Sequence, residues 1–89
     1  MQVSSAFGKT LKKWRLFRKV SQEKLADLCD LDRTFISMLE TGKRQPTLTT
    51  IFQISQALKI APEELIRQTH RQMKKSSRPH SGSSPSRRL

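Results

Sequence analysis

The fold is decided by residues 21–43, which read SQEKLADLCDLDRTFISMLETGK. Ser21 suits the cap position of a helix, because its hydroxyl can accept a hydrogen bond from a backbone N–H that the first turn leaves unpaired. The residues that follow at helical spacing are small or apolar and form one side of that helix: Leu25, Ala26 and Cys29. This pattern predicts a helix over about 22–29.

A second short helix follows almost at once. Asp32 stands where its cap is expected. The helical spacing turns Phe35 or Ile36 inward together with Leu39, which predicts a helix over about 33–40. Only Asp30-Leu31-Asp32 separates the two helices, too short a connection for them to lie side by side, so they are expected to cross steeply as in a helix-turn-helix.

The segment before this motif also has helical spacing. Phe7, Leu11 and Trp14 fall on one apolar stripe, which predicts a helix over about 4–18. After the motif, Gly42 can adopt the left-handed conformation that closes a helix, and Pro46 prevents any continuation.

Two more helices are expected beyond this loop. Thr47 caps the fourth, and its apolar face is formed by Leu48, Ile51, Ile54, Ala57 and Leu58. Pro62 suits the first position of a fifth, followed by Glu63 and Glu64 near the positive end of the helix dipole. The expected fold class is therefore all-α, a compact domain of five helices.

Basic residues outnumber acidic ones, most strongly at the end of the chain. The 89 residues carry 18 Lys and Arg against 7 Asp and Glu, a formal net charge of +11. This balance favours an extended anion as partner, with nucleic acid ahead of an acidic membrane surface. All seven acids lie in residues 1–68, which we expect to form the folded domain.

Residues 69–89 are expected to form a basic, serine-rich tail. They hold six Lys or Arg, no acid and few apolar residues, so they cannot bury enough surface to offset the entropy of ordering. We expect the tail to be mostly disordered, apart from a fraying helix that reaches about Lys75. It suits either a solubilising segment or a sequence-independent arm for DNA phosphates.

Other classes of function find no residues to support them. Cys29 is the single cysteine, so it forms no intramolecular disulfide, and no Cys and His cluster has the spacing of a metal site. No catalytic triad, Cys-His pair or glycine-rich phosphate loop is present, so neither an enzyme nor a cofactor is expected. No apolar run is long enough for a signal peptide or a membrane span, which predicts a cytoplasmic protein.

Four pieces of sequence, taken in order, resemble a known family. They are Leu11-Lys12-Lys13-Trp14-Arg15, Ser21-Gln22-Glu23-Lys24-Leu25-Ala26, Ile36 with Leu39-Glu40-Thr41-Gly42-Lys43, and Pro46-Thr47-Leu48. Residues 7–66 resemble the lambda-repressor and Cro-like (XRE-type) helix-turn-helix domains of prokaryotic and phage regulators. The likeness is strongest to the short controller proteins of restriction-modification systems.

The resemblance implies roles for the matching positions. The family presents base-reading side chains to the major groove from positions that are here Asp32, Arg33, Thr34, Ser37 and Met38. It contacts DNA phosphates from positions that are here Gln22, Lys43, Arg44 and Thr47, and the residue at Gln22 also buttresses the reading helix. Arg15 and Glu40 match a partly buried structural salt bridge.

Two of these roles have further arguments. Arg33 is the strongest candidate base reader, because its planar fork matches the two acceptors of guanine, although a phosphate-bound or solvated arginine is the alternative. Asp32 serves either as a helix cap, as an acceptor from cytosine, or as both.

Three positions depart from the family pattern. Asp30 and Lys59 stand where the family often has glycine, and aspartate tolerates left-handed geometry better than most residues. Met38 stands where many relatives carry a polar base reader, which leaves an apolar contact with a thymine methyl as its option.

The sequence therefore predicts a sequence-specific transcriptional regulator, a repressor by family type, that is prokaryotic or phage-encoded and associated with the nucleoid. One reading helix covers only about four base pairs, so a homodimer on an inverted-repeat operator is expected. The candidate pairing residues are Leu16, Phe17, Phe52, Ile60, Leu65, Ile66 and Met73. The alternative is the antitoxin of a toxin-antitoxin pair, with a toxin rather than the polymerase as protein partner.

Overall fold

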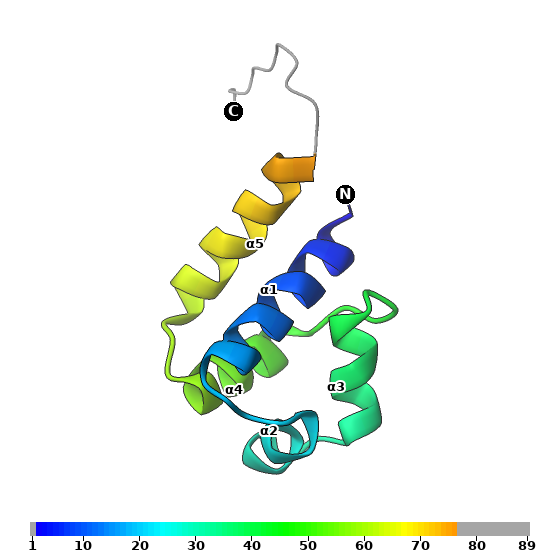
Figure 1. Ribbon diagram of the computed structural model, residues 1–89, viewed down its shortest axis with the longest axis vertical. Helices are drawn as coiled ribbons and strands as arrows, with labels where there is room; N and C mark the ends of the chain where they lie inside the picture. The colour runs from blue at the N-terminus through cyan, green and yellow to red at the C-terminus, as the bar shows by residue number, and fades with distance from the viewer. Residues whose placement is uncertain (1, 77–89) are drawn as a thin grey trace.

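Helix α1 (Val3–Phe17) runs through the middle of the computed structural model, which describes residues 2–76 (Figure 1). Helix α5 (Pro62–Ser76) lies along one side of α1, and helix α3 (Arg33–Glu40) lies on the other. Helices α2 (Gln22–Cys29) and α4 (Leu48–Leu58) contact each other at the end of the molecule farthest from the last turn of α5. Residues 2–76 contain these five helices and no strand, which confirms the expected all-α class.

The core receives side chains from all five helices. The largest of those with almost no exposed surface are Leu11, Leu25, Ile36, Leu39, Ile54, Leu58 and Leu65. Trp14 and Phe35 pack against this core while remaining half-buried, and the Trp14 indole N–H donates to the Gln68 side chain of α5 at 3.0 Å. The core thus fixes both motif helices against α1 and α4.

Two of the three expected side-chain caps are present. The hydroxyls of Ser21 and Thr47 accept from the backbone N–H groups of Lys24 and Thr50. The expectation for Asp32 is wrong, since its carboxylate makes no cap hydrogen bond although its backbone adopts the cap conformation. The third N–H of α3, a usual target of such a cap, already donates to the Asp32 carbonyl at 3.0 Å.

Left-handed residues other than glycine follow three of the described helices. Lys19 after α1 has φ 59°, Asp30 after α2 has φ 58° and Lys59 after α4 has φ 57°. The last two stand where the family resemblance implies glycine. Aspartate adopts this conformation with less strain than lysine does, because its short polar side chain can hydrogen-bond locally. Gly42, with φ 78°, occupies the left-handed position beyond α3 as the sequence predicts.

One feature of the fold differs from the sequence-based expectation. Leu48 is 74% exposed rather than part of the inner face of α4, because Thr50 and Ile51 fill the inward positions of that first turn. Helix α5 continues beyond residue 68 to Ser76, close to the helix end expected near Lys75, and Thr69 is buried within it. The expected disorder of the remaining tail lies outside the described residues.

A close approach between α1 and the end of α3 depends on Gly8. A Cβ atom at this position would overlap the backbone carbonyl oxygens of Leu39 and Glu40, which cannot move away without distorting α3. The glycine therefore lets α1 support the last turn of α3 directly. This role cannot be predicted from the sequence, because a glycine inside a helix carries no signal of what it packs against.

Candidate nucleic-acid interface

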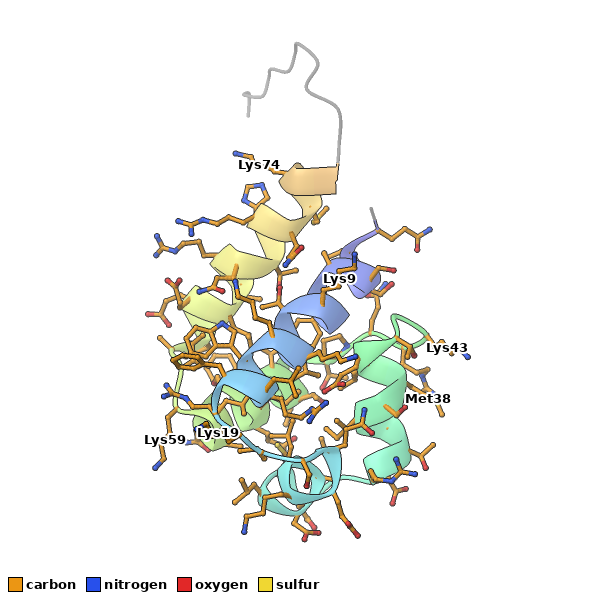
Figure 2. The ribbon with its side chains drawn as sticks, in the orientation of Figure 1. Lys9, Lys19, Met38, Lys43, Lys59 and Lys74 are labelled. Atoms are coloured by element: carbon orange, nitrogen blue, oxygen red, sulfur yellow. The ribbon has the colours of Figure 1, made fainter. Side chains whose placement is uncertain are left out.

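The turn between α2 and α3 sets the orientation of α3. Asp30 reverses the chain in the left-handed conformation, and the Leu31 N–H then donates to the Ala26 carbonyl at 2.8 Å. Helix α3 consequently leaves α2 at a steep angle, with Ile36 and Leu39 in the core and its opposite side turned to solvent (Figure 2). A short helix with one free side is the element that a major groove can accept.

The five residues expected to read bases differ in exposure. Asp32, Arg33 and Thr34 are exposed, while Ser37 and Met38 are half-buried on the same solvent-facing part of α3. All five are thus placed around the first two turns of one helix. Their side chains carry a guanidinium, two hydroxyls, a carboxylate and a thioether, which together can contact base edges of several kinds.

The expected ion pair between α1 and α3 is present. Arg15 Nε lies 2.5 Å from Glu40 Oε2, and Arg15 Nη2 donates to Glu40 Oε1 at 3.1 Å. The two side chains are only 9% and 3% exposed. Arg15 Nη1 donates in addition to the Val20 carbonyl at 2.8 Å, so the guanidinium also holds the turn before α2. Glu40 is therefore a structural carboxylate rather than a catalytic one.

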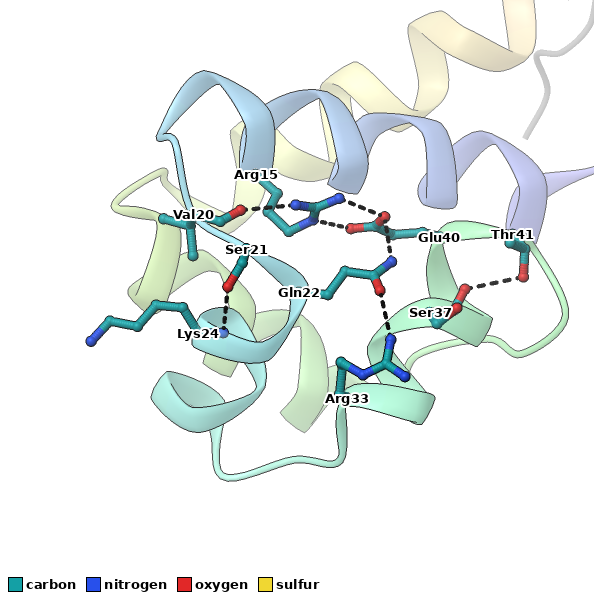
Figure 3. Close-up of polar contacts among 9 residues, drawn as sticks. All are labelled: Arg15, Val20, Ser21, Gln22, Lys24, Arg33, Ser37, Glu40 and Thr41. Carbon is teal, nitrogen blue, oxygen red and sulfur yellow. Dashed lines mark hydrogen bonds and ion pairs between the residues drawn. The ribbon is translucent and has the colours of Figure 1, made fainter.

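Gln22 connects this ion pair to the solvent side of α3 (Figure 3). Its Nε2 donates to Glu40 Oε1 at 3.1 Å, and its Oε1 accepts from Arg33 Nη1 at 3.3 Å. The amide lies at the N-terminus of α2, and its two bonds support α3 as the family resemblance implies. The sequence did not identify Glu40 as one of its partners, because no spacing rule predicts a side-chain contact between two different helices.

A basic loop follows α3. Lys43 and Arg44 are both exposed, and the Lys43 side chain points away from the body of the molecule (Figure 2). The Arg44 guanidinium lies 5.8 Å from the centre of the Phe35 ring, which restricts its position beside α3. Thr47, at the end of the loop, combines its cap bond with a contact to the Thr50 hydroxyl at 3.0 Å.

Arg18 is a second structural arginine that the sequence analysis missed. Its Nε and Nη2 donate to the carbonyls of Leu58 and Lys59 at 2.7 and 2.9 Å, at the C-terminus of α4. A cation there satisfies unpaired carbonyl oxygens and meets the negative end of the helix dipole. The same guanidinium lies 5.4 Å from the ring centres of Trp14 and Phe17. Arg18 therefore joins α1 to α4 and is not one of the cations directed at a ligand.

Cys29 is a buried residue of the inner face of α2. Desolvation raises the pKa of its thiol above the ordinary value, which keeps it neutral and unreactive at neutral pH. Among residues 2–76, no group of three or more His, Cys, Asp or Glu could hold a metal ion. No helix in this part of the chain is long and apolar enough to cross a membrane.

These elements define a class of protein. A capped helix, a left-handed turn and a steeply crossing second helix with one polar free side form a helix-turn-helix, the framework of a DNA-binding domain. The family model described as helix-turn-helix matches residues 11–65.

Named proteins are similar over most of the chain. Control protein C.BamHI of Bacillus amyloliquefaciens is 46% identical over 61 residues, which make up 67% of this chain and 75% of that protein. Control protein C.MunI of a Mycoplasma species is 45% identical over 60 residues, or 66% of this chain and 81% of that protein. Restriction-modification controller protein C.AhdI from Aeromonas hydrophila has a similar structure with TM-score 0.68 and 39% identity, covering 70% of this chain and 94% of that one.

The chain belongs to the XRE-type helix-turn-helix family. It is accordingly a DNA-binding transcriptional regulator and not an enzyme, in agreement with the expectation from its sequence.

Proposed function

We propose that the protein binds a specific inverted-repeat operator as a homodimer, with one α3 in the major groove of each half-site. The observation that carries this proposal is the solvent-facing side of α3, where exposed polar side chains stand on a helix whose other side is anchored in the core. The controller proteins named above support the restriction-modification context, which is a proposal for this chain.

Arg33 is the principal base reader in this proposal. It is exposed near the start of α3, and its guanidinium can donate two parallel hydrogen bonds to the O6 and N7 atoms of guanine. Thr34 and Ser37 contribute single hydrogen bonds, and Met38 offers an apolar surface to a thymine methyl. Asp32 accepts from the amino group of cytosine, since its carboxylate is not used as a helix cap.

Phosphate contacts flank this reading helix. On one side of α3, Gln22 contacts the phosphate backbone. On the other side, the phosphate contacts come from Lys43, Arg44 and Thr47 at the start of α4. Phosphate contacts of this kind fix register and orientation without carrying sequence information. The two positive charges of the loop also supply the salt-dependent part of the affinity.

Exposed apolar residues suggest where two copies pair. Leu48 and Phe52 are 74% and 56% exposed and stand one turn apart on α4. Pro46 and Ile66 belong to the lining of a hollow of about 140 Å³. We call this the α4–α5 surface, defined by Pro46, Leu48, Phe52 and Ile66. Ile60 and Leu65, two of the residues expected to pair, are buried in the core and cannot take part.

The position of this surface fits its proposed task. Its first residues, Pro46 and Leu48, adjoin the basic loop, so pairing there brings the phosphate contacts of two copies close together. The other exposed apolar pair, Leu16 and Phe17, lies at the C-terminal end of α1 and serves as an internal control.

Selection of binding sites from a random duplex library tests the proposal. At about 0.15 M salt, where phosphate attraction is largely screened, an inverted repeat with half-sites about 10 base pairs apart or a small multiple of that should be enriched. Binding that shows no enrichment and vanishes with added salt would contradict it.

Sedimentation equilibrium tests the pairing surface. Leu48→Ser with Phe52→Ser should shift the protein from dimer to monomer, whereas Leu16→Ser with Phe17→Ser should leave the dimer intact. Both variants replace two exposed apolar residues, so general loss of hydrophobic surface affects them equally. The opposite result would move the interface to the end of α1. No observation in residues 2–76 favours the antitoxin alternative.

A further inference from the structure

The polar contacts beneath α3 form one continuous chain from a buried ion pair to an exposed base reader. Arg15 is bonded to Glu40, Glu40 accepts from Gln22, and Gln22 accepts from Arg33 (Figure 3). This series of hydrogen bonds leads from α1 to the end of α3, then to α2, and finally to the first turn of α3. The buried end of this network is Glu40, whose side chain is 3% exposed, and the solvent end is Arg33, which is exposed.

The direction of the hydrogen bonds along this chain is fixed by chemistry. An ionised carboxylate can only accept, and a guanidinium can only donate. Arg15 holds the carboxylate of Glu40 on one side, so the side of Glu40 that faces Gln22 must receive a donor. The amide of Gln22 must therefore turn its nitrogen to Glu40 and its oxygen outward, toward the donor of Arg33.

The reverse orientation of the amide would be costly on both sides. It would place the Gln22 oxygen against the carboxylate and the Gln22 nitrogen against the guanidinium of Arg33. Each side would then lose a charge-assisted hydrogen bond, the stronger class of such bonds. Glu40 thus determines which atom Gln22 presents to α3.

We propose that Glu40 is a positioning residue for base readout, which fixes the guanidinium of Arg33 by setting the amide orientation of Gln22. With one N–H of Nη1 held by Gln22, the guanidinium loses rotational freedom before DNA is bound, while its remaining donors stay free for guanine. The ion pair of Arg15 and Glu40 therefore has a second task besides joining two helices. This inference rests on the proposed function, and specifically on Arg33 as a base reader.

The test measures preference at one base pair rather than affinity as a whole. The operator position read by Arg33 is the one whose preference disappears in Arg33→Ala. The dissociation constant is then measured for all four bases at that position, and for substitutions at a half-site position that Arg33 does not read. The ratio between the best and the other bases is the discrimination.

Glu40→Gln keeps the size of the side chain but offers a single oxygen, for which Arg15 and Gln22 compete. The amide of Gln22 is then no longer held in one orientation, and discrimination at the Arg33 position should fall about 3- to 10-fold, the effect of one hydrogen bond. Discrimination at the control position should stay unchanged. Gln22→Met should produce the same loss, and the double variant should lose no more than Gln22→Met alone.

Two further variants keep the test decisive. If Glu40→Gln does not fold, Arg15→Met with Glu40→Met removes both buried charges together and leaves neither one unpaired. In an Arg33→Ala background, Gln22→Met should change no base preference, because the residue that it positions is absent.

The outcomes separate this inference from the proposed function. A loss of affinity that is equal for every base would mean that Gln22 serves phosphate contact alone, and would overturn the inference while the operator specificity of the unchanged protein stands. A protein that selects no operator at all would overturn the proposed function first. Circular dichroism of each variant confirms that the helices are intact.

Discussion

The inner and outer sides of α3 differ in how far their side chains are buried. On the inner side, Ile36 and Leu39 are completely buried, and Glu40 is held by an arginine that is itself buried. On the outer side, Arg33 and Thr34 are exposed. The comparison teaches that this helix of eight residues carries stability mainly on its inner side and recognition on its outer side. Substitutions on the two sides should therefore fail in different ways, except at Glu40, which is joined to Arg33 through Gln22.

The largest expected effect belongs to the inner side. Glu40→Ala leaves the guanidinium of Arg15 buried without its carboxylate, which should lower the free energy of unfolding by about 3 to 5 kcal/mol. Urea denaturation followed by circular dichroism measures this change. Arg15→Met with Glu40→Met is the matched control, because removing both charges should cost much less. Equal losses in the two variants would show that packing rather than charge accounts for the effect.

Arg33→Ala tests the outer side. It should leave the free energy of unfolding within about 0.5 kcal/mol of the unchanged protein, as is usual for exposed positions. Discrimination at one base pair should fall by about 1 to 3 kcal/mol. Competition binding with single-base operator variants measures it. A uniform loss across all operator positions would instead make Arg33 a phosphate contact.

The N-terminal ends of α2 and α3 sharpen the comparison further. Ser21 caps α2 through its hydroxyl, so Ser21→Ala should cost about 1 kcal/mol of stability. Asp32 occupies the same position in α3 without a cap bond, so Asp32→Ala should cost almost none. Thermal unfolding of the two variants side by side checks this difference. Equal destabilisation of the two variants would mean that the carboxylate of Asp32 caps α3 after all.

How far the sequence predicts this structure follows from the same distinction. The bounds of α2 and α3 were predictable because local signals act there: a serine cap, a three-residue turn and apolar residues at helical spacing. The ion pair of Arg15 and Glu40 was predictable only through the family resemblance, since 25 residues separate its members.

Other features depend on packing that no local pattern records. Leu48 is exposed because other residues of the first turn of α4 face the core. The sequence pattern does not decide this, because an apolar residue at the start of a helix can face either the core or the solvent. The need for Gly8 follows from the distance between α1 and the carbonyls at the end of α3. The bond from Gln22 to Glu40 requires α2 and α3 to be in place before the two side chains can meet. In each case the deciding partner is distant in sequence.

The smallest expected effect concerns the loop beyond α3, which belongs to neither side of that helix. Lys43 is exposed, and Lys43→Ala should weaken binding to every sequence alike while the base preferences stay the same. The slope of log affinity against log salt should decrease by about 1, since one phosphate contact releases about one counterion. Fluorescence anisotropy over a series of salt concentrations measures this slope. Lys24→Ala, on the exposed side of α2, removes the same charge away from α3 and should leave the slope unchanged. If both variants lower the slope equally, the affinity depends on net charge rather than on a defined contact, and the loop would lose its place in the interface.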